Sequence, residues 1–271
     1  MTNPFTNPSI TAPRRGAKPT PSPEHLVEGS LSAPGGRPLK DLADIVMNRR
    51  ATSHFTNEAV PAEVLDFILR VGAQAPSGYN LQPWRFIVVR TEGGRKRLRK
   101  ASMNQEKITE APLVIIAIGM KSEPLAMAEE ILAEGARRGA GSPEEVEKTA
   151  VQARKFLSEF PLEVWVNRHT MIAVTYLMLA AEACGYDTAP MEGFDPAGIK
   201  RGFGVPEEGE IVALLAIGRM KEPDKAYPGR LPLDRIFFRE SYGLPWHEGF
   251  SSEAGEEKAK GPSAPHNLNE F

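Results

Sequence analysis

The residues with the clearest chemical capacity lie in a polar loop and in a pair of arginines upstream of it. The loop occupies residues 76–84 and reads Pro-Ser-Gly-Tyr-Asn-Leu-Gln-Pro-Trp, and the pair is Arg49-Arg50. The two prolines restrict the backbone, the serine and asparagine supply short hydrogen-bonding groups, and Gly78 permits a close backbone approach or a positive φ. Arginines can grip a phosphate through charge-assisted, bidentate hydrogen bonds. These residues favour a cradle for a flat ligand, although the loop alone is equally consistent with a turn before a strand.

Other signatures of catalysis are missing from the sequence. His54, His169 and His247 do not have the spacing of metal ligands, and a single cysteine, Cys184, excludes a Cys/His cluster, so we expect no metal. Neither a Walker motif nor a G-x-G-x-x-G after a strand occurs. We therefore assign no catalytic side chain from these motifs.

Composition is typical of a soluble enzyme and excludes several other classes. The chain has 271 residues, enough to bury a sizeable core in one large domain or two. A formal net charge of −2 gives no basic field for nucleic acid. The absence of an apolar secretory segment favours a cytoplasmic protein. The longest apolar run, residues 171–184, is too short to span a bilayer, so we expect no membrane association.

The elements that must position these residues alternate between helix and strand. Apolar residues recur at helical spacing around residues 39–46 and 61–72. A capping serine followed by proline and two acids predicts a helix from Ser142 to about residue 160, and a shorter helix is expected after Asp195. Apolar runs predict strands at residues 86–89, 113–119 and 211–218. No internal repeat is evident, and the mixture indicates an α+β fold.

One helix and both ends of the chain differ from the rest in composition. The helix over residues 171–184 is apolar nearly all round, which predicts burial on every side, either in the core or against a second subunit. Residues 1–38, a Pro/Gly-rich extension, and residues 251–271, a polar tail, cannot bury a core of their own. They are either disordered tails or extended arms across a partner, which leaves residues 39–250 as the folded domain.

The order of several motifs resembles the FMN-dependent nitroreductase family. That family has Arg-Arg-Ser-x-Arg-x-Phe, a Val-Pro helix start, and Ala-Pro-Ser-x-x-Asn-x-Gln-Pro-Trp before a strand; the matching residues here are 49–55, 60–61 and 75–84. Residues 189–195 resemble its Pro-x-Glu/Gly-Gly-Phe-Asp turn, and residues 229–232 resemble its terminal Ser-Arg-Leu-Pro element. The matches are specific because they occur together and in the family's order.

This resemblance implies a fold, an assembly and a cofactor. The family fold is α+β, with a mostly antiparallel central sheet flanked by helices, and the family forms intertwined homodimers with extended terminal arms. FMN would be the cofactor and NAD(P)H its reductant. The residues that the resemblance assigns to FMN are Arg49, Arg50, Ala51, Ser53, Pro76, Ser77, Gly78, Asn80, Gln82, Asn104, Lys107, Pro190, Met191, Glu192, Gly193 and Arg230.

The resemblance assigns the FMN phosphate to arginines from distant parts of the chain. Arg49 and Arg230 match family phosphate-binding positions. The family lysine two residues before the terminal arginine is Pro228 here, so one phosphate contact is in doubt, and Arg50 is the candidate to replace it.

The pyrimidine edge of the flavin would meet residues 104–107, which resemble the family's Asn-x-x-Lys. A lysine near N1 and O2 stabilises the negative charge of the reduced flavin. Lys107 is equally consistent with a solvated helix face. Ala51 and Ser53 replace a frequent family serine and a basic residue, so the cradle would have fewer side-chain contacts than usual.

Two further segments take roles from the resemblance. Backbone N–H groups of residues 190–193 would meet the flavin N5 and O4 atoms, a task that suits fixed donors. A general acid–base role for the Glu192 side chain is the less favoured alternative. Residues 121–161 would cover the active site and set acceptor choice, with Phe156 and Phe160 directed inward, or would be a solvated helical excursion.

The predicted activity is that of an FMN-dependent oxidoreductase. NAD(P)H would reduce the flavin and leave, and a nitroaromatic, a quinone or an activated alkene would then accept the hydride in a ping-pong cycle. Two alternatives stay open: a flavin-fragmenting or reductive-dehalogenase branch of the same family, and a non-enzymatic flavin-binding protein. The sequence does not choose between NADH and NADPH.

Overall fold

The structure, a computed structural model, describes residues 40–139, 141–221 and 228–246. The extensions expected at residues 1–38 and 251–271 lie outside this part of the chain. The chain divides into two compact units, Met1–Lys225 and Ala226–Phe271, and each is described by itself.

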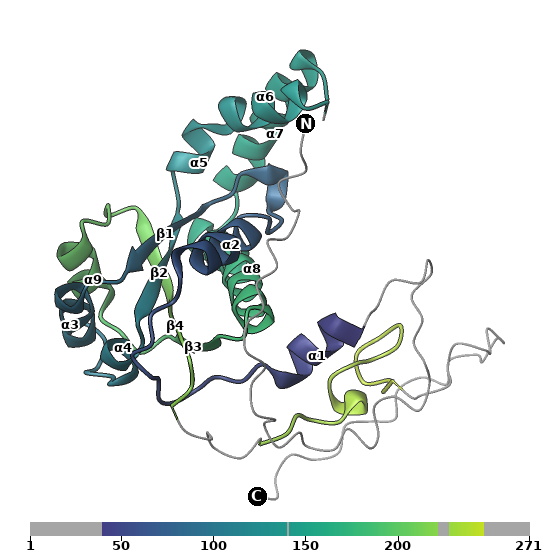
Figure 1. Cartoon of the computed structure of the whole chain (residues 1–271). Helices are drawn as coiled ribbons and strands as arrows, with labels where there is room; N and C mark the ends of the chain where they lie inside the picture. The colour runs from purple at the N-terminus through teal and green to yellow at the C-terminus, as the bar shows by residue number, and fades with distance from the viewer. Residues whose placement is uncertain (1–39, 140, 222–227, 247–271) are drawn as a thin grey trace, which may run out of the picture. The chain divides into compact units, whose positions relative to one another are not determined.

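Four strands form the sheet of the first unit, in the order β1-β2-β4-β3, and every neighbouring pair is antiparallel (Figure 1). The strands are β1 (Trp84–Val89), β2 (Leu113–Met120), β3 (Asp187–Met191) and β4 (Gly209–Gly218). The predicted α+β class with a mostly antiparallel sheet is confirmed, and β1, β2 and β4 lie close to their predicted positions. The sequence does not predict β3 because it is short and contains Pro190, which weakens a strand assignment. Its place at the sheet edge accommodates the missing N–H of proline.

Helices account for most of the remaining described chain. They are α1 (Lys40–Asn48), α2 (Ala62–Gly72), α3 (Glu92–Lys100), α4 (Lys107–Glu110), α5 (Glu123–Ala126), α6 (Ala128–Arg137), α7 (Pro143–Ser158), α8 (Leu162–Ala183) and α9 (Pro196–Phe203), with 3-10 turns η1 (Gly78–Asn80) and η2 (Leu233–Arg235). As predicted, α7 begins at Ser142, which forms a capping box with Glu145. Helix α9 begins after Asp195, also as predicted.

The helices cover both faces of the sheet, so the first unit has three layers (Figure 1). Successive strand residues point to opposite faces, and β2 is buried along its whole length. Its residues Ile115 and Ala117 pack in one core with apolar side chains of α2 and α8. Val114 and Ile116 pack in a second core with side chains of α3, α4 and α9. The continuous apolar run of β2 is therefore explained by two covered faces.

Helices α5, α6 and α7 form an excursion with a small core of its own (Figure 1). This excursion corresponds to the segment 121–161 of the sequence analysis. Leu157 of α7 packs in one cluster with Leu81 of the polar loop. Arg154 of α7 forms an ion pair with Glu129 of α6, which ties the two helices together. The excursion is therefore helical and contacts the polar loop.

Helix α8 is less enclosed than its sequence predicts. Ala173, Val174 and Leu177 are buried, whereas Ile172 is 37% exposed and Thr175 is exposed. Within a single chain the predicted burial on every side is incomplete, because part of the apolar surface of this helix faces outward; burial of that part against a second subunit stays a prediction. Across the described residues, none of the helices is long and apolar enough to cross a lipid bilayer.

Residues 228–246 of the second unit form turns that are held by local hydrogen bonds. Phe238 forms an antiparallel bridge with Pro245, and the Trp246 N–H donates to the Phe237 carbonyl at 2.9 Å. The rings of Phe238 and Tyr242 lie 4.6 Å apart between centroids. These contacts give the unit a local order of its own.

Candidate functional site

The segment that follows the arginine pair lies against β3 and the end of β4. Ala51 forms a parallel bridge with Thr188, and the Thr52 N–H donates to the Thr188 carbonyl at 3.1 Å. Phe55 forms an antiparallel bridge with Met220. The side chains of Thr52 and Phe55 are buried. The backbone that carries the predicted phosphate-binding arginines is therefore fixed beside the strand that leads into the 190–193 turn.

The segment at residues 104–107 meets that turn directly. The Gln105 side-chain amide donates to the Gly193 carbonyl at 2.8 Å. A Cβ added at Gly193 would lie 3.1 Å from the sulfur of Met103, so the exposed Met103 side chain would have to shift slightly to admit a larger residue. The structure therefore brings together the two segments that the resemblance assigns to the pyrimidine edge and to N5.

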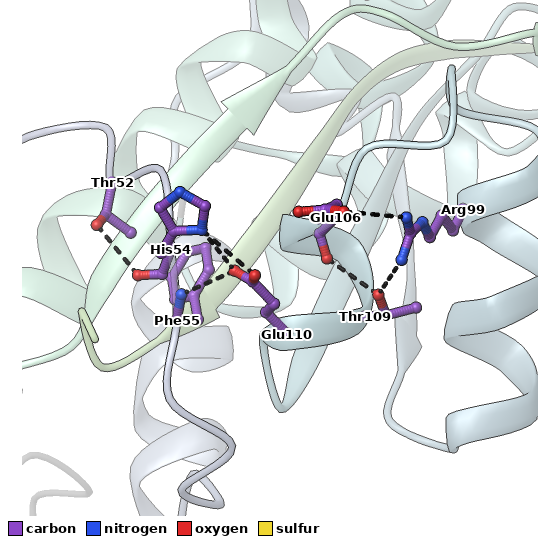
Figure 2. A network of polar contacts seen from close by, with 7 residues as sticks. All are labelled: Thr52, His54, Phe55, Arg99, Glu106, Thr109 and Glu110. Atoms are coloured by element: carbon purple, nitrogen blue, oxygen red, sulfur yellow. Dashed lines mark hydrogen bonds and ion pairs between the residues drawn. The ribbon is translucent and has the colours of Figure 1, made fainter. Parts of the chain in front are cut away.

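A carboxylate links the arginine segment to α4 (Figure 2). One Glu110 oxygen accepts a hydrogen bond from the Phe55 N–H at 3.2 Å and lies 3.2 Å from Nδ1 of His54. Glu110 ends α4 and Lys107 begins it, so the two residues are one helical turn apart. The contact fixes the helix that presents Lys107 relative to the arginine segment.

This group of segments has polar groups available for a ligand. Within the described ranges, no acceptor pairs with the backbone N–H groups of Glu192 and Gly193, and the ammonium group of Lys107, a half-buried residue, has no hydrogen-bond or ion-pair partner. Unpaired backbone donors and an ammonium group without a partner suit a ligand edge that carries acceptor atoms and develops negative charge. The pyrimidine edge of FMN has this chemistry, so the residues present fit that cofactor.

The polar loop forms a second group of predicted site residues. The Ser77 hydroxyl accepts a hydrogen bond from the Gln82 N–H at 2.9 Å, which closes the turn. Tyr79, Asn80 and Gln82 have φ values of 55°, 54° and 45°. Left-handed backbone therefore occurs at these residues and not at Gly78. A Cβ added at Gly78 would lie 3.4 Å from a tryptophan ring nitrogen of α8, an ordinary packing distance, so the contacts with α8 do not require glycine there either.

A pocket of about 400 Å³ opens between the polar loop and α6. The amide side chains of Asn80 and Gln82 line one side of it, and Glu130 and Ile131 of α6 are among the residues that line the other. The pocket thus combines hydrogen-bonding amides, an apolar surface and charge beside the predicted ligand cradle.

Aromatic side chains join the excursion to the same loop. The ring of Tyr79 lies 6.1 Å from that of Phe156, and Phe156 stacks on Phe160 at 5.6 Å between centroids. The side chain of Phe156 is nevertheless 46% exposed. Phe156 therefore lies beside the polar loop with an accessible face, and Phe160 packs behind it.

The two groups of site residues lie at opposite corners of the sheet. The polar loop enters β1 at Trp84, which pairs with Gly119, whereas Thr188, beside the arginine segment, pairs with Ile217 opposite Leu113. Gly119 and Leu113 are six residue steps apart on β2, or roughly 20 Å. Strands β1 and β3 are also the two outer strands of the sheet. One copy of the chain therefore does not bring its own polar loop to its arginine segment.

Two further residues discussed in the sequence analysis are Arg230 and Cys184. Arg230 lies in the second unit, where it is exposed and one guanidinium nitrogen donates to the Gly229 carbonyl at 2.7 Å. Its role toward a phosphate stays a prediction. Cys184 is buried, and burial raises the pKa of its thiol, which disfavours the reactive thiolate.

Sequence reasoning missed the residues that support the predicted contacts. Glu110 reaches a residue 55 positions away, and Gln105 reaches one 88 positions away. No local pattern encodes contacts of that range. The one available signal is the spacing of Glu110 from Lys107, which places both on one side of a short helix.

Comparison with known proteins identifies the family. The sequence profile described as the Nitroreductase family matches residues 46–219, and the chain belongs to this family. An NADH dehydrogenase of Thermus thermophilus is 34% identical over 201 residues, which cover 73% of this chain and 96% of that protein. YdgI of Bacillus subtilis, assigned as an NAD(P)H nitroreductase, is 34% identical over 205 residues, 72% of this chain and 96% of that one.

A solved structure gives the corresponding comparison of folds. A protein of Exiguobacterium sibiricum, assigned to the nitroreductases and solved in complex with FMN, matches with a TM-score of 0.68 and 27% identity. The match covers 75% of this chain and 99% of that one. The resemblance seen in the sequence, and the fold that it implies, are confirmed.

Proposed function

We propose that the protein is an FMN-dependent oxidoreductase that uses NAD(P)H as its reductant. The observation that carries the proposal is the convergence of three distant segments at residues 49–55, 104–107 and 190–193, through the contacts of Glu110 and Gln105. Family membership supports it, as do relatives named for NADH or NAD(P)H and a structural relative that binds FMN.

Each segment has a separate task in this proposal. Bound FMN would accept a hydride from NAD(P)H and pass it to a second substrate. Arg49 and Arg50 hold the phosphate, and Lys107 offsets negative charge at the pyrimidine edge. The N–H groups of Glu192 and Gly193 donate to the N5 side, where fixed backbone donors cost no reorganisation. No side chain needs to act as a general acid or base.

A homodimer completes the site in this proposal. The polar loop of one subunit lies over the FMN held by the arginine segment of the other. The roughly 20 Å offset of the two groups along the sheet supports this arrangement, because it separates them in a single chain. The outward apolar surface of α8 around Ile172 supplies a face for the partner.

The acceptor would enter beside the polar loop. Nitroaromatics, quinones and activated alkenes are flat, with an apolar body and polar ends. The amides of Asn80 and Gln82, the apolar side chain of Ile131 and the exposed face of Phe156 suit molecules of that kind. We also propose that the enzyme acts in the cytoplasm, where NAD(P)H is supplied. Turnover with NAD(P)H separates the proposal from a non-enzymatic flavin-binding protein.

The direct test is the identity of the bound chromophore. The purified protein is expected to be yellow and to release FMN when denatured, one per subunit, as identified by chromatography against FMN and FAD standards. A colourless protein that takes up no added FMN, or one that releases FAD only, would overturn the proposal.

A further inference from the structure

An arginine on α3, Arg99, contacts both the 104–107 segment and helix α4, which begins at Lys107. Arg99 Nε donates to the Asn104 side-chain oxygen Oδ1 at 2.8 Å and to the Asn104 carbonyl at 3.1 Å. A second guanidinium nitrogen donates to the Thr109 hydroxyl at 3.0 Å, and a third lies 3.7 Å from Glu106 (Figure 2). The Arg99 side chain is only 27% exposed. One guanidinium group therefore joins both ends of a segment that carries two predicted flavin contacts.

The turn held by Arg99 has an unusual backbone. Met103 and Asn104 have φ values of 51° and 54°, in the left-handed region. Asparagine adopts such angles readily, whereas methionine keeps them only where its surroundings hold it. The Asn104 N–H also donates to the Arg99 carbonyl at 3.2 Å, so Arg99 grips this residue through both backbone and side chain.

The contact has a chemical consequence for Asn104. Because the Asn104 Oδ1 atom is held against Arg99, the NH₂ group of the amide is directed away from the guanidinium group and can donate to a ligand. Asn104 is thereby set as a hydrogen-bond donor, which matches the carbonyl acceptors on a flavin pyrimidine edge. The bond to Thr109 anchors the guanidinium group on α4, which holds its contact with Asn104 in place.

We propose that Arg99 is a positioning residue for FMN and acts through Asn104. It fixes the left-handed turn and directs the Asn104 NH₂ group toward the pyrimidine edge. This inference rests on the proposed function, since it assumes that FMN binds at this site. Arg99 does not itself touch the cofactor.

The test compares FMN affinity and the midpoint potential of bound flavin in a set of variants. Arg99→Ala is expected to weaken FMN binding on the order of tenfold, as outer-shell partners do at metal sites. It should also lower the midpoint potential, because the donor that favours the reduced flavin becomes mobile. Arg99→Lys keeps the charge but not the fork of donors, so it should shift both quantities in the same direction.

Arg97→Ala is the matched control. Arg97 lies on the same helix, but its guanidinium group sits 4.7 Å above the Phe203 ring and does not contact the turn. Removing it changes the net charge equally and should leave the FMN affinity within about twofold of wild type and the midpoint potential unchanged. If Arg99→Ala fails to fold, Arg99→Lys takes its place.

A double-mutant cycle decides whether Arg99 acts through Asn104. In an Asn104→Ala background, Arg99→Ala or Arg99→Lys should cause no further change in FMN affinity or potential. Fully additive effects, or Arg99 variants that behave like Arg97→Ala, would overturn the inference. A wild-type protein that binds no FMN would instead overturn the proposed function, and this outcome appears before any variant is compared.

Discussion

Arg49 and Arg50 are adjacent in sequence but are not equivalent in the structure. Arg50 uses one guanidinium nitrogen to donate to the Arg49 carbonyl at 2.7 Å, so part of its donor capacity is engaged by its own backbone. Arg49 matches the family's phosphate-binding position and is the first candidate for a bidentate grip on the FMN phosphate, with Arg50 as the candidate to add to it.

Arg49→Ala should weaken FMN binding by about 1.5–3 kcal/mol, the contribution of a charge-assisted hydrogen bond. Arg50→Ala should weaken it less. Titration of apoprotein with FMN, followed by the quenching of flavin fluorescence, measures both losses. An Arg49→Ala protein with wild-type affinity would remove this residue from the phosphate site.

Lys107 is the residue at which the solvated and functional interpretations differ most clearly. If its ammonium group lies beside the pyrimidine edge, Lys107→Gln should lower the midpoint potential of the bound flavin, because reduction then places negative charge near a neutral side chain. Spectroelectrochemistry measures the potential. An unchanged potential in a variant that retains FMN would assign Lys107 to a solvated helix face.

At the scale of elements, the sequence predicted those helix starts and strands whose signals lie within a few neighbouring residues. The capping serine of α7, the proline that begins α9 and the apolar runs of β2 and β4 each carry a signal within a few residues. Strand β3 carries none, since Pro190 opposes the assignment and only pairing with β4 holds it in the sheet. The hydrogen bonds of Glu110 and Gln105 could not be predicted for the same reason. The family motifs predicted which residues contact FMN, whereas the positions of these residues in space depend on tertiary contacts that no motif predicts.

The α5–α7 excursion carries the prediction about acceptor choice. Phe156→Ala should change the ratio of kcat/KM between a bulky and a small acceptor, because Phe156 has an accessible face and its ring lies close to the polar loop. FMN occupancy should stay intact. Steady-state kinetics with a matched pair of quinones gives the ratio, and Phe160→Ala provides the second variant. A ratio unaltered by either substitution would favour a solvated excursion without substrate contact.

At the scale of the whole molecule, the separation of the two groups of site residues is the main structural constraint. A homodimer with closed symmetry contains two equivalent sites, and each site can draw on both chains. In the proposed arrangement, one subunit supplies the arginine segment of a site and the other subunit supplies its polar loop. Substitutions in the two segments therefore affect the same site only when they are in different subunits.

Mixed dimers test this directly. Arg49→Ala and Asn80→Ala subunits, each defective in FMN binding as a homodimer, are co-expressed with different tags, and the heterodimer is isolated. One of its two sites then carries both defects and the other carries none, so about half of the sites should bind FMN with wild-type affinity. Recovery of no tight site would show that each chain builds its FMN site alone. A monomer in solution that retains FMN would lead to the same conclusion.

The central claim is that the protein takes electrons from a nicotinamide cofactor onto FMN and passes them on. Anaerobic titration of the yellow protein with NADH, and separately with NADPH, tests it in one cuvette. The expected result is loss of the visible flavin absorbance with about one equivalent of at least one nucleotide per FMN, followed by its return when a quinone or nitroaromatic is added. A flavin that neither nucleotide bleaches would contradict the account.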